Sequence, residues 1–315
     1  MDSQKVILVI LDGLRFDTAQ SSMGYLAHLI ETSQASLYKV QAELPTLSRP
    51  LYEVLLTGTA TSVNGITAND VARLSHQTSL FHLATQQGLT TAAAAFHWFS
   101  ELYNQFPFDR FTDREQHHLH LPIQHGKFYW DEAYPDSHLF ADAEALRQGC
   151  HPNFMLVHPM GIDYTGHRFG GESAEYRGRA IATDSLLAQV LPRWISAGYE
   201  ILITADHGMN ADGQHGGIRA DVRETPLFCI SSRNRPGTYL EGISQLAIAP
   251  LICQLLALPY GKNMRPSKIP GWPISAESSS SPEQKPLDLA LADPGLLSDR
   301  PIAAATTPLA QRTEL

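Results

Sequence analysis

The sequence is short of cysteine and of charged residues. It has only three cysteines in 315 residues, Cys150, Cys229 and Cys253, and they lie far apart. An odd and scattered set suggests neither a disulfide framework nor a cysteine-type zinc site, and it is compatible with a reducing compartment. Charged residues make up 17% of the chain, and 32 acidic against 23 basic side chains give a net charge of -9. This balance argues against binding to nucleic acid polymers or anionic lipid, but a bound metal would still allow a small phosphate substrate.

Long apolar runs are also absent. The run nearest the amino terminus, residues 6–11, has six residues before Asp12. It is too short for a membrane span or for the apolar core of a usual signal peptide. We therefore expect a cytoplasmic protein that meets a small-molecule substrate and no membrane. The sequence leaves the oligomeric state open.

Short apolar runs without alternation are the main structural signal. They lie at residues 6–11, 90–96, 154–160 and 200–205, with a shorter one at 227–230. Such runs are typical of strands that are buried on both faces of a parallel sheet. Helical patterns separate them, at residues 25–33, 79–88 and 175–198. Strand and helix alternation predicts an α/β fold, a three-layer sandwich with a mostly parallel central sheet.

Two segments depart from this pattern. Residues 101–140 carry aromatic and histidine residues in irregular order, and we expect a small inserted cap or irregular lobe there. Residues 276–315 are rich in Ser, Pro, Ala and Asp, a composition that buries little apolar surface. We expect a flexible, low-complexity tail over that range and a single folded domain over residues 1–275.

Carboxylate and imidazole side chains follow the apolar runs or lie in glycine-flanked turns. Six stand out: Asp12, Asp163, His167, Asp206, His207 and His215. Taken singly, each has an ordinary structural explanation, such as a helix cap or a turn. Because ligands of open α/β sheets bind beyond the carboxyl ends of the strands, the six side chains can converge on one point. Oxygen and nitrogen ligands without thiolate suit two divalent ions, zinc first and manganese second, as in two-metal phosphoryl transfer.

One hydroxyl lies in a suggestive position. Ser48 occurs in "LPTLSRPLYEVLLTG", residues 44–58, and on its own it is an ordinary serine of a turn before a helix. A serine is a weak nucleophile until its proton is easier to lose, and a coordinated metal ion lowers that cost. The predicted metal centre therefore makes Ser48 the candidate nucleophile.

Five ordered blocks together resemble the alkaline phosphatase superfamily, and within it the nucleotide pyrophosphatase/phosphodiesterase branch. They are "VILVILDGLRFD", "PTLSRPLYEVLLTGTATSVNGITAND", "GIDYTGHRFG", "TADHGM" and "QHGG". The blocks run from about residue 5 to about residue 230. The resemblance implies that residues 1–275 form an alkaline-phosphatase-like catalytic domain.

The resemblance also implies a role for each matching residue. One ion would be held by Asp163, His167 and His215. The other would be held by Asp12, Asp206 and His207, and it would also bind the Ser48 oxygen. In this branch an asparagine beyond the nucleophile helps to bind a phosphoryl oxygen, and Asn69 stands at the matching offset.

Two departures from the branch bear on the substrate. The nucleophile is serine where the branch usually has threonine, and Arg49 replaces the phenylalanine that follows it. Arg49 is a candidate phosphate contact that would favour a dianionic monoester. A solvated arginine at the start of a helix is the alternative interpretation.

The expected function is that of a metal-dependent, two-metal hydrolase. It would act on phosphodiesters or nucleotide pyrophosphates through a phospho-serine intermediate. A phosphomonoesterase, or a hydrolase of phosphonates or sulfate esters, is the alternative on the same metal site. A metal-stabilised binding module without activity is the alternative from another class of protein.

Overall fold

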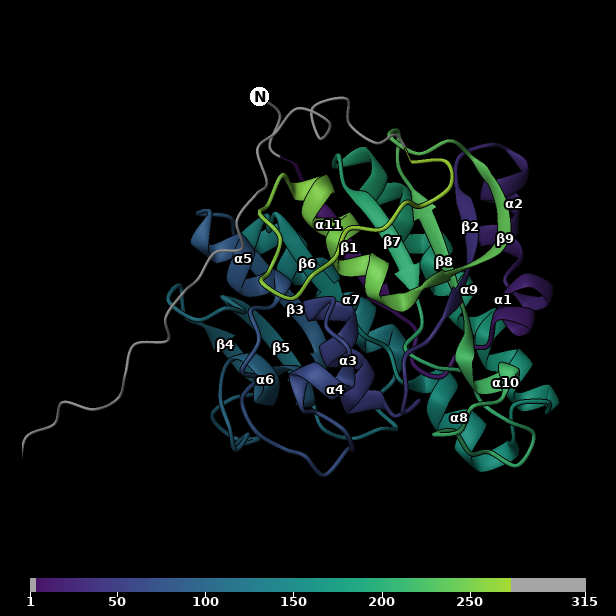
Figure 1. Ribbon diagram of the computed structural model, residues 1–315, viewed down its shortest axis with the longest axis horizontal. Helices are drawn as coiled ribbons and strands as arrows, with labels where there is room; N and C mark the ends of the chain where they lie inside the picture. Colours follow the sequence, from purple (N-terminus) through teal and green to yellow (C-terminus); the bar gives the residue numbers. More distant parts are fainter. Residues whose placement is uncertain (1–3, 273–315) are drawn as a thin grey trace, which may run out of the picture.

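A nine-stranded sheet forms the centre of the computed structural model, which describes residues 4–272 (Figure 1). Its strand order is β4-β5-β3-β6-β1-β7-β8-β2-β9. The strands are β1 (Val6–Ile10), β2 (Ser36–Gln41), β3 (Thr91–Phe96), β4 (Glu115–His117), β5 (His125–Tyr129), β6 (Phe154–Val157), β7 (Glu200–Thr204), β8 (Glu224–Ile230) and β9 (Gly237–Ser244). Pairing is parallel from β5 through β3, β6 and β1 to β7, and antiparallel at β4–β5, β7–β8 and β8–β2. The predicted mostly parallel sheet is confirmed, whereas the tail predicted at 276–315 lies outside the described residues.

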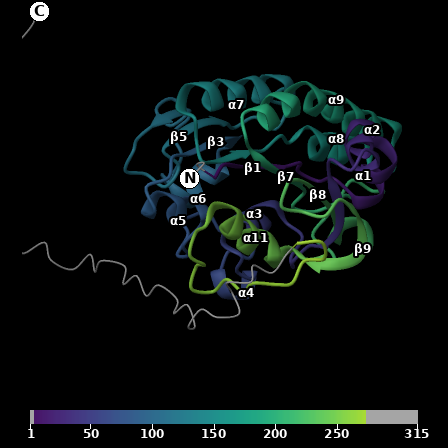
Figure 2. The same ribbon diagram turned by 90° about the horizontal axis from the view of Figure 1, so that it is seen from above.

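Helices cover both faces of this sheet. They are α1 (Phe16–Ser22), α2 (Gly24–Glu31), α3 (Ser48–Thr57), α4 (Thr61–Asn64), α5 (Leu80–Gln86), α6 (Trp98–Tyr103), α7 (Asp136–Cys150), α8 (Gly161–Phe169), α9 (Ala174–Ser196), α10 (Ala220–Arg223) and α11 (Ile248–Leu256). Figure 2 shows α7 and α9 on one side of the sheet and α3 and α11 on the other. The architecture is the predicted three-layer sandwich.

The central strand β1 contributes to two separate cores. Val6, Leu8 and Ile10 pack in the core beneath α3, α5 and α11. Ile7 and Val9 pack in the core beneath α2, α7 and α9. Successive side chains of a strand point to opposite faces, so a strand covered on both faces must be apolar at every position. This explains the unalternating run at the amino terminus.

The register of the central strands aligns their carboxyl ends. Val9 of β1 pairs with Val157 of β6 and with Ile203 of β7. The residues that follow these three strands therefore emerge at the same edge of the sheet. This alignment positions the candidate site.

The apolar runs and helical patterns of the sequence correspond to real elements. The four longer runs are β1, β3, β6 and β7, the shorter one lies in β8, and the three helical patterns are α2, α5 and α9. The structure differs in the segment 101–140, where β4 and β5 extend the sheet beyond β3. Irregular chain is confined to the connections around these two short strands, and a capping role for them stays a prediction.

A buried carboxyl group links α3 to its surroundings. Glu53 is fully buried and accepts hydrogen bonds from the Ser75 hydroxyl and from the Tyr103 hydroxyl, the latter at 2.8 Å. Burial disfavours the charged form and raises the pKa of Glu53 to about 7. The folded protein therefore holds this proton more tightly than the unfolded chain does.

This raised pKa predicts a stability change with pH. The stabilisation from the Glu53 proton is complete below the ordinary pKa of 4.5 and is lost as the pH rises through about 7. We expect Glu53→Gln to remove this loss, on the order of 3 kcal/mol, when free energies of unfolding by urea are compared at pH 5 and pH 8. If the free energy of unfolding changes equally in both proteins, the assigned pKa is wrong.

Candidate active site

Polar side chains gather at the carboxyl edge of the sheet. Asp12 follows β1, His158 follows β6 directly, and Asp206 and His207 follow β7. All four are completely buried. The turn after Asp12 needs glycine, because Gly13 has a φ of +73° and a Cβ there would lie 2.8 Å from Asp163 Oδ1.

Asp12, Asp206 and His207 form the first group of candidate ligands. One ligand atom from each residue lies within 4.8 Å of the others. His207 Nε2 lies 3.6 Å from Asp12 Oδ1 and 3.3 Å from Asp206 Oδ2. His207 Nδ1 donates to the Gly208 carbonyl at 2.9 Å, which leaves the lone pair on Nε2 facing the carboxylates.

Asp163, His167 and His215 form the second group, again with ligand atoms within 4.8 Å of one another. Asp163 and His167 lie one turn apart on α8, and His167 Nε2 is 3.3 Å from Asp163 Oδ2. His167 Nδ1 donates to the Gly213 carbonyl and His215 Nδ1 to the Thr46 carbonyl, both at 2.8 Å. Their Nε2 atoms therefore face each other across 3.2 Å, ready to share a cation.

The two groups adjoin. The rings of His207 and His215 stack with centroids 3.8 Å apart. The structure thus brings together all six residues that the sequence predicts as ligands. Their assignment to metal ions remains a proposal.

The buried carboxyl groups of the site favour the binding of cations. Asp12 Oδ1, Asp163 Oδ1 and Asp206 Oδ2 are buried and have no hydrogen-bond partner within residues 4–272. Burial, together with the charges of Asp12 and Asp163, raises the pKa of Asp206 well above its ordinary value. Burial and the charge of Asp12 likewise raise the pKa of Asp163. Burial thus disfavours the charged forms of Asp163 and Asp206, and divalent ions bound between these carboxyl groups would offset that cost.

Asp12 is held ionised by its neighbours. Burial alone would raise its pKa, but the hydrogen bond to His158 and the nearby His207 outweigh burial and lower it. His158 Nε2 lies 3.0 Å from Asp12 Oδ2, and the Tyr52 hydroxyl also donates to that oxygen. One oxygen of Asp12 is thus fixed by the protein, and the other, Oδ1, has no hydrogen-bond partner within residues 4–272 and is free to act as a ligand.

Sequence reasoning did not single out His158 or Tyr52 for this role. His158 ends the apolar run of β6, the same strand-end position that marks Asp12 after β1. Tyr52 lies one helical turn after Ser48 on α3, so the two side chains share a face. The strand-end position would have identified the first, and the helical spacing the second.

The support from His158 predicts a loss of metal affinity on its removal. His158→Leu is expected to weaken cation binding by about 10- to 100-fold, because Asp12 loses the donor that orients it. His158→Gln keeps an N–H donor and should retain most of the affinity. Competition with a chelating dye measures both, and equal affinities in the two variants would contradict the positioning role.

Ser48 begins α3 beside the first group. Its Oγ lies 3.1 Å from His207 Nε2. Asn69 Oδ1 accepts the Arg49 backbone N–H at 3.1 Å, so that N–H is not directed at substrate here. The Asn69 amide nitrogen has no hydrogen-bond partner among the described residues. The arrangement leaves it able to donate to a phosphoryl oxygen beside Ser48.

Arg49 is not a solvated arginine. It is 2% exposed, and its Nη2 lies 2.7 Å from Glu101 Oε2. Its guanidinium carbon lies 4.4 Å from the ring centroid of Trp98. The exposed interpretation is therefore wrong. Its Nε and Nη1 atoms lack hydrogen-bond partners within residues 4–272, and a contact to phosphate stays a prediction.

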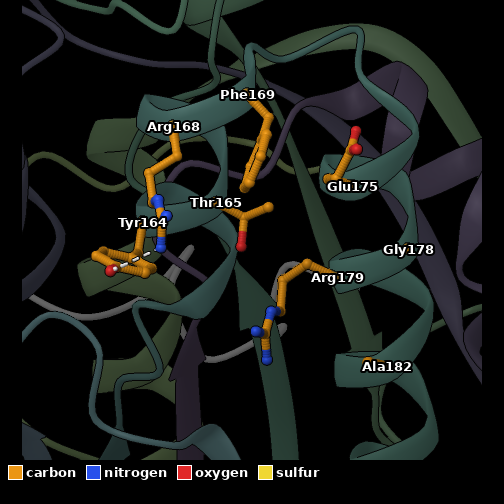
Figure 3. Close-up of a pocket in the computed structure, with 8 residues that line it drawn as sticks. All are labelled: Tyr164, Thr165, Arg168, Phe169, Glu175, Gly178, Arg179 and Ala182. Carbon is orange, nitrogen blue, oxygen red and sulfur yellow. Dashed lines mark hydrogen bonds between the residues drawn. The ribbon is translucent and has the colours of Figure 1, made fainter.

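A surface cavity of about 480 Å³ lies between α8 and α9 (Figure 3). Thr165, Phe169 and Arg179 project into it, and Arg168 donates to the Tyr164 hydroxyl at 3.2 Å. None of the six candidate ligands lines this cavity.

The fold and the two groups of oxygen and nitrogen side chains at the carboxyl edge of the sheet define the class of protein. This class is the alkaline phosphatase superfamily. Residues 6–221 match the type I phosphodiesterase / nucleotide pyrophosphatase family, and the chain belongs to that family. This is a family of enzymes, and its fold supports phosphoryl transfer. The family predicted from the sequence is confirmed.

Solved structures with a similar fold agree. Murine ectonucleotide pyrophosphatase / phosphodiesterase 5 is 14% identical, with a TM-score of 0.66 over 84% of this chain and 98% of that one. A wild-type alkaline phosphatase is 11% identical, with a TM-score of 0.63 over 86% of this chain and 98% of that one. At these identities the likeness establishes the fold.

Two relatives found by sequence comparison are named as transferases. The catalytic subunit of human GPI ethanolamine phosphate transferase 2 is 23% identical over 274 residues, which is 82% of this chain and 27% of the relative. The Saccharomyces cerevisiae GPI ethanolamine phosphate transferase 2 is 24% identical, over 82% of this chain and 34% of the relative. The chain thus spans about a quarter to a third of the length of these relatives.

The predicted cytoplasmic location is wrong. The finding that overturns it is the similarity to GPI ethanolamine phosphate transferases, of which this chain spans only about a quarter to a third. The prediction depended on a missing leader or span, which says little about a chain that spans so small a part of its relatives. Within residues 4–272, no helix has both the length and the apolar character needed to cross a membrane.

Proposed function

We propose that this protein cleaves phosphodiesters by phosphoryl transfer to Ser48 at a two-metal centre. The observation that carries the proposal is the pair of adjoining ligand groups with Ser48 Oγ beside the first, 3.1 Å from His207 Nε2. In the proposed centre Asp12, Asp206 and His207 hold one divalent ion. The second group holds the other, with zinc first and manganese second as the metals.

The chemistry divides between the two ions and the chain. Bound divalent ions lower the pKa of a coordinated hydroxyl and stabilise the charge on attacking and leaving oxygens. Ser48 Oγ would lose its proton to solvent and form the new bond to phosphorus as the bond to the leaving oxygen breaks, and that oxygen would take up a proton from solvent to leave as an alcohol. A phospho-serine that still carries the other ester group results, and water then releases it and restores the serine.

One side chain and one helix of the protein orient the phosphoryl group. Asn69, anchored through its Oδ1 to the Arg49 backbone, donates from its amide nitrogen to a non-bridging oxygen. The position of Ser48 at the start of α3 adds the positive end of the helix dipole. A single negative charge on a diester suits these neutral donors, and this favours a diester over a dianionic monoester.

A nearby cavity could bind the organic part of the substrate. A hollow of about 610 Å³ is lined by His97, Phe108, Phe111 and Trp130, among others. It adjoins the Arg49–Glu101 pair, because Phe108 donates its backbone N–H to Glu101 at 3.4 Å. Its aromatic lining and volume suit the ester group of a small-molecule phosphodiester or nucleotide.

A second candidate function is transfer of the phosphoryl group to an alcohol instead of water. The observation in its favour is the similarity to GPI ethanolamine phosphate transferases across 82% of this chain. The same phospho-serine would form first, and the second attack would come from a hydroxyl of the acceptor. Hydrolysis and transfer therefore share every residue named above.

A substrate panel on metal-stripped protein reloaded with zinc or with manganese tests the proposal. We expect bis-(p-nitrophenyl) phosphate to turn over at least about tenfold faster than the monoester, phenylphosphonate or p-nitrophenyl sulfate. Faster turnover of one of those three would move the assignment to the corresponding hydrolase. Addition of ethanolamine-type alcohols separates transfer from hydrolysis, because transfer gives a new diester product. Bound metal without turnover of any ester would indicate a binding module.

A further inference from the structure

A third group of metal-type ligands lies away from the candidate active site. His117 of β4 and His125 of β5 are direct cross-strand partners, and their Nδ1 atoms are 3.0 Å apart. Cys150, the last residue of α7, completes the group. One ligand atom from each of the three lies within 4.8 Å of the others.

The pleat of the edge strands explains why these residues meet. His125 and Lys127 are two residues apart in β5, so their side chains point to the same face. The ammonium group of Lys127 lies 3.7 Å from Asp142 Oδ1 on α7, which identifies this face as the one that α7 covers. His117, opposite His125, shares that face, and Cys150 reaches it from the end of the same helix.

We propose that His117, His125 and Cys150 bind a transition-metal ion, zinc first, with a fourth position open to solvent. Two imidazoles and a thiolate suit a borderline-soft ion and not magnesium or calcium, which prefer oxygen ligands. Two nitrogens bound at about 2.0–2.1 Å to a tetrahedral ion lie roughly 3.3 Å apart. The observed separation of 3.0 Å is close to that value. The spacing of the cysteines along the chain does not predict this site, because the site uses only one of them.

This site is separate from the phosphoryl-transfer centre. His125 begins β5 and Cys150 lies just before β6, so the group sits at the amino ends of parallel strands. The candidate catalytic residues lie at the carboxyl ends. An ion in the third group therefore does not meet the reacting phosphate. It joins the β4–β5 edge of the sheet, seen beside β3 in Figure 1, to α7.

The difference in solvent exposure among the three cysteines makes the proposed site testable. Cys150 is partly exposed, whereas Cys229 and Cys253 are buried, so a small alkylating reagent reports mainly on Cys150. Binding of the ion displaces the thiol proton to solvent and covers the sulfur. The two active-site groups contain no sulfur, so a thiolate-to-metal signal identifies the third group.

The experiment uses the metal-stripped protein of residues 1–315 with Zn²⁺ or Co²⁺ alone as the probe. Zn²⁺ is expected to slow alkylation of Cys150 by iodoacetamide at least about tenfold, as followed by mass spectrometry. Co²⁺ is expected to give a near-ultraviolet thiolate charge-transfer band. His117→Ala and His125→Ala should lose both effects, and Cys150→Ser should lose the band.

His138→Ala is the matched control, because it removes another exposed histidine, on α7, outside the group. It should behave like the wild type in both measurements. Phosphodiester turnover should be unchanged in His117→Ala and Cys150→Ser. An alkylation rate that does not respond to Zn²⁺, or a Co²⁺ band that persists in Cys150→Ser, would overturn the proposal.

Discussion

Ser48→Ala is expected to lower phosphodiester turnover by at least about a thousandfold while both ligand groups keep their metal. The loss follows because the hydroxyl that takes the phosphoryl group is absent, and no other described hydroxyl is hydrogen-bonded to His207. Metal content should persist because all six carboxylate and imidazole ligands are unchanged. Steady-state rates and metal analysis on the same preparation measure the two quantities together.

Ser48→Thr is the control for this substitution. It keeps the hydroxyl, and threonine is the usual nucleophile of the branch that the sequence resembles, so substantial activity should remain. Rapid quenching of the wild type with a slow diester should also show a phosphoryl adduct on Ser48. Near wild-type turnover of Ser48→Ala would rule out the nucleophile assignment, whatever the metal content.

Asp206→Asn is expected to have opposite effects on function and on the stability of the metal-free protein. The first ligand group loses a charged oxygen, so metal content should fall toward one ion and turnover should fall at least about a hundredfold. In metal-free protein the substitution removes one of three crowded carboxylates. Its Oδ1 can still accept the Gly13 N–H, so the local backbone is preserved.

The direction of the stability change follows from the raised pKa of Asp206. A group whose pKa is raised by folding stabilises the fold at low pH and loses that contribution as the pH rises through its folded pKa. Asp206→Asn should therefore raise the Tm of metal-free protein by a few degrees at pH 8 and by less at pH 5. Thermal melts with excess chelator measure this.

Asp184→Asn is the matched control for Asp206→Asn. Asp184 is also buried, but it accepts the backbone N–H groups of Tyr25 and Leu26 and lies outside both ligand groups. It should leave metal content and turnover unchanged. A lower Tm of metal-free Asp206→Asn at every pH would show that repulsion among the carboxylates is not what limits the stability of the empty site.

The candidate site was largely predictable because parallel strands carry their end residues to one edge. Asp12 and Asp206 end apolar runs that are adjacent in the sheet, and in-register pairing brings them together. Asp163 and His167 needed only the spacing of one helical turn. His215 follows no strand, and only its glycine neighbours and the resemblance to a family marked it.

Other features depended on tertiary contacts that no local pattern encodes. The burial of Arg49 follows from Glu101 and Trp98, which lie about fifty residues further along the chain. Strands β4 and β5 are short and carry polar and histidine residues, so their periodicity did not separate them from loop. The third ligand group was hidden for the same reason, because its members come from an edge hairpin and a helix end.

Thr46 gives the site a mechanical property. Its carbonyl accepts from His215, its hydroxyl donates to the Gly217 carbonyl at 3.0 Å, and that same hydroxyl accepts the Gly216 N–H at 2.9 Å. These hydrogen bonds hold the loop that precedes Ser48 against the loop that carries His215. Because these hydrogen bonds couple the motions of the two loops, an ion bound by His215 would also restrict the mobility of the segment that positions Ser48. Occupancy of the second ligand group by its ion and the precision of attack by Ser48 would then be coupled.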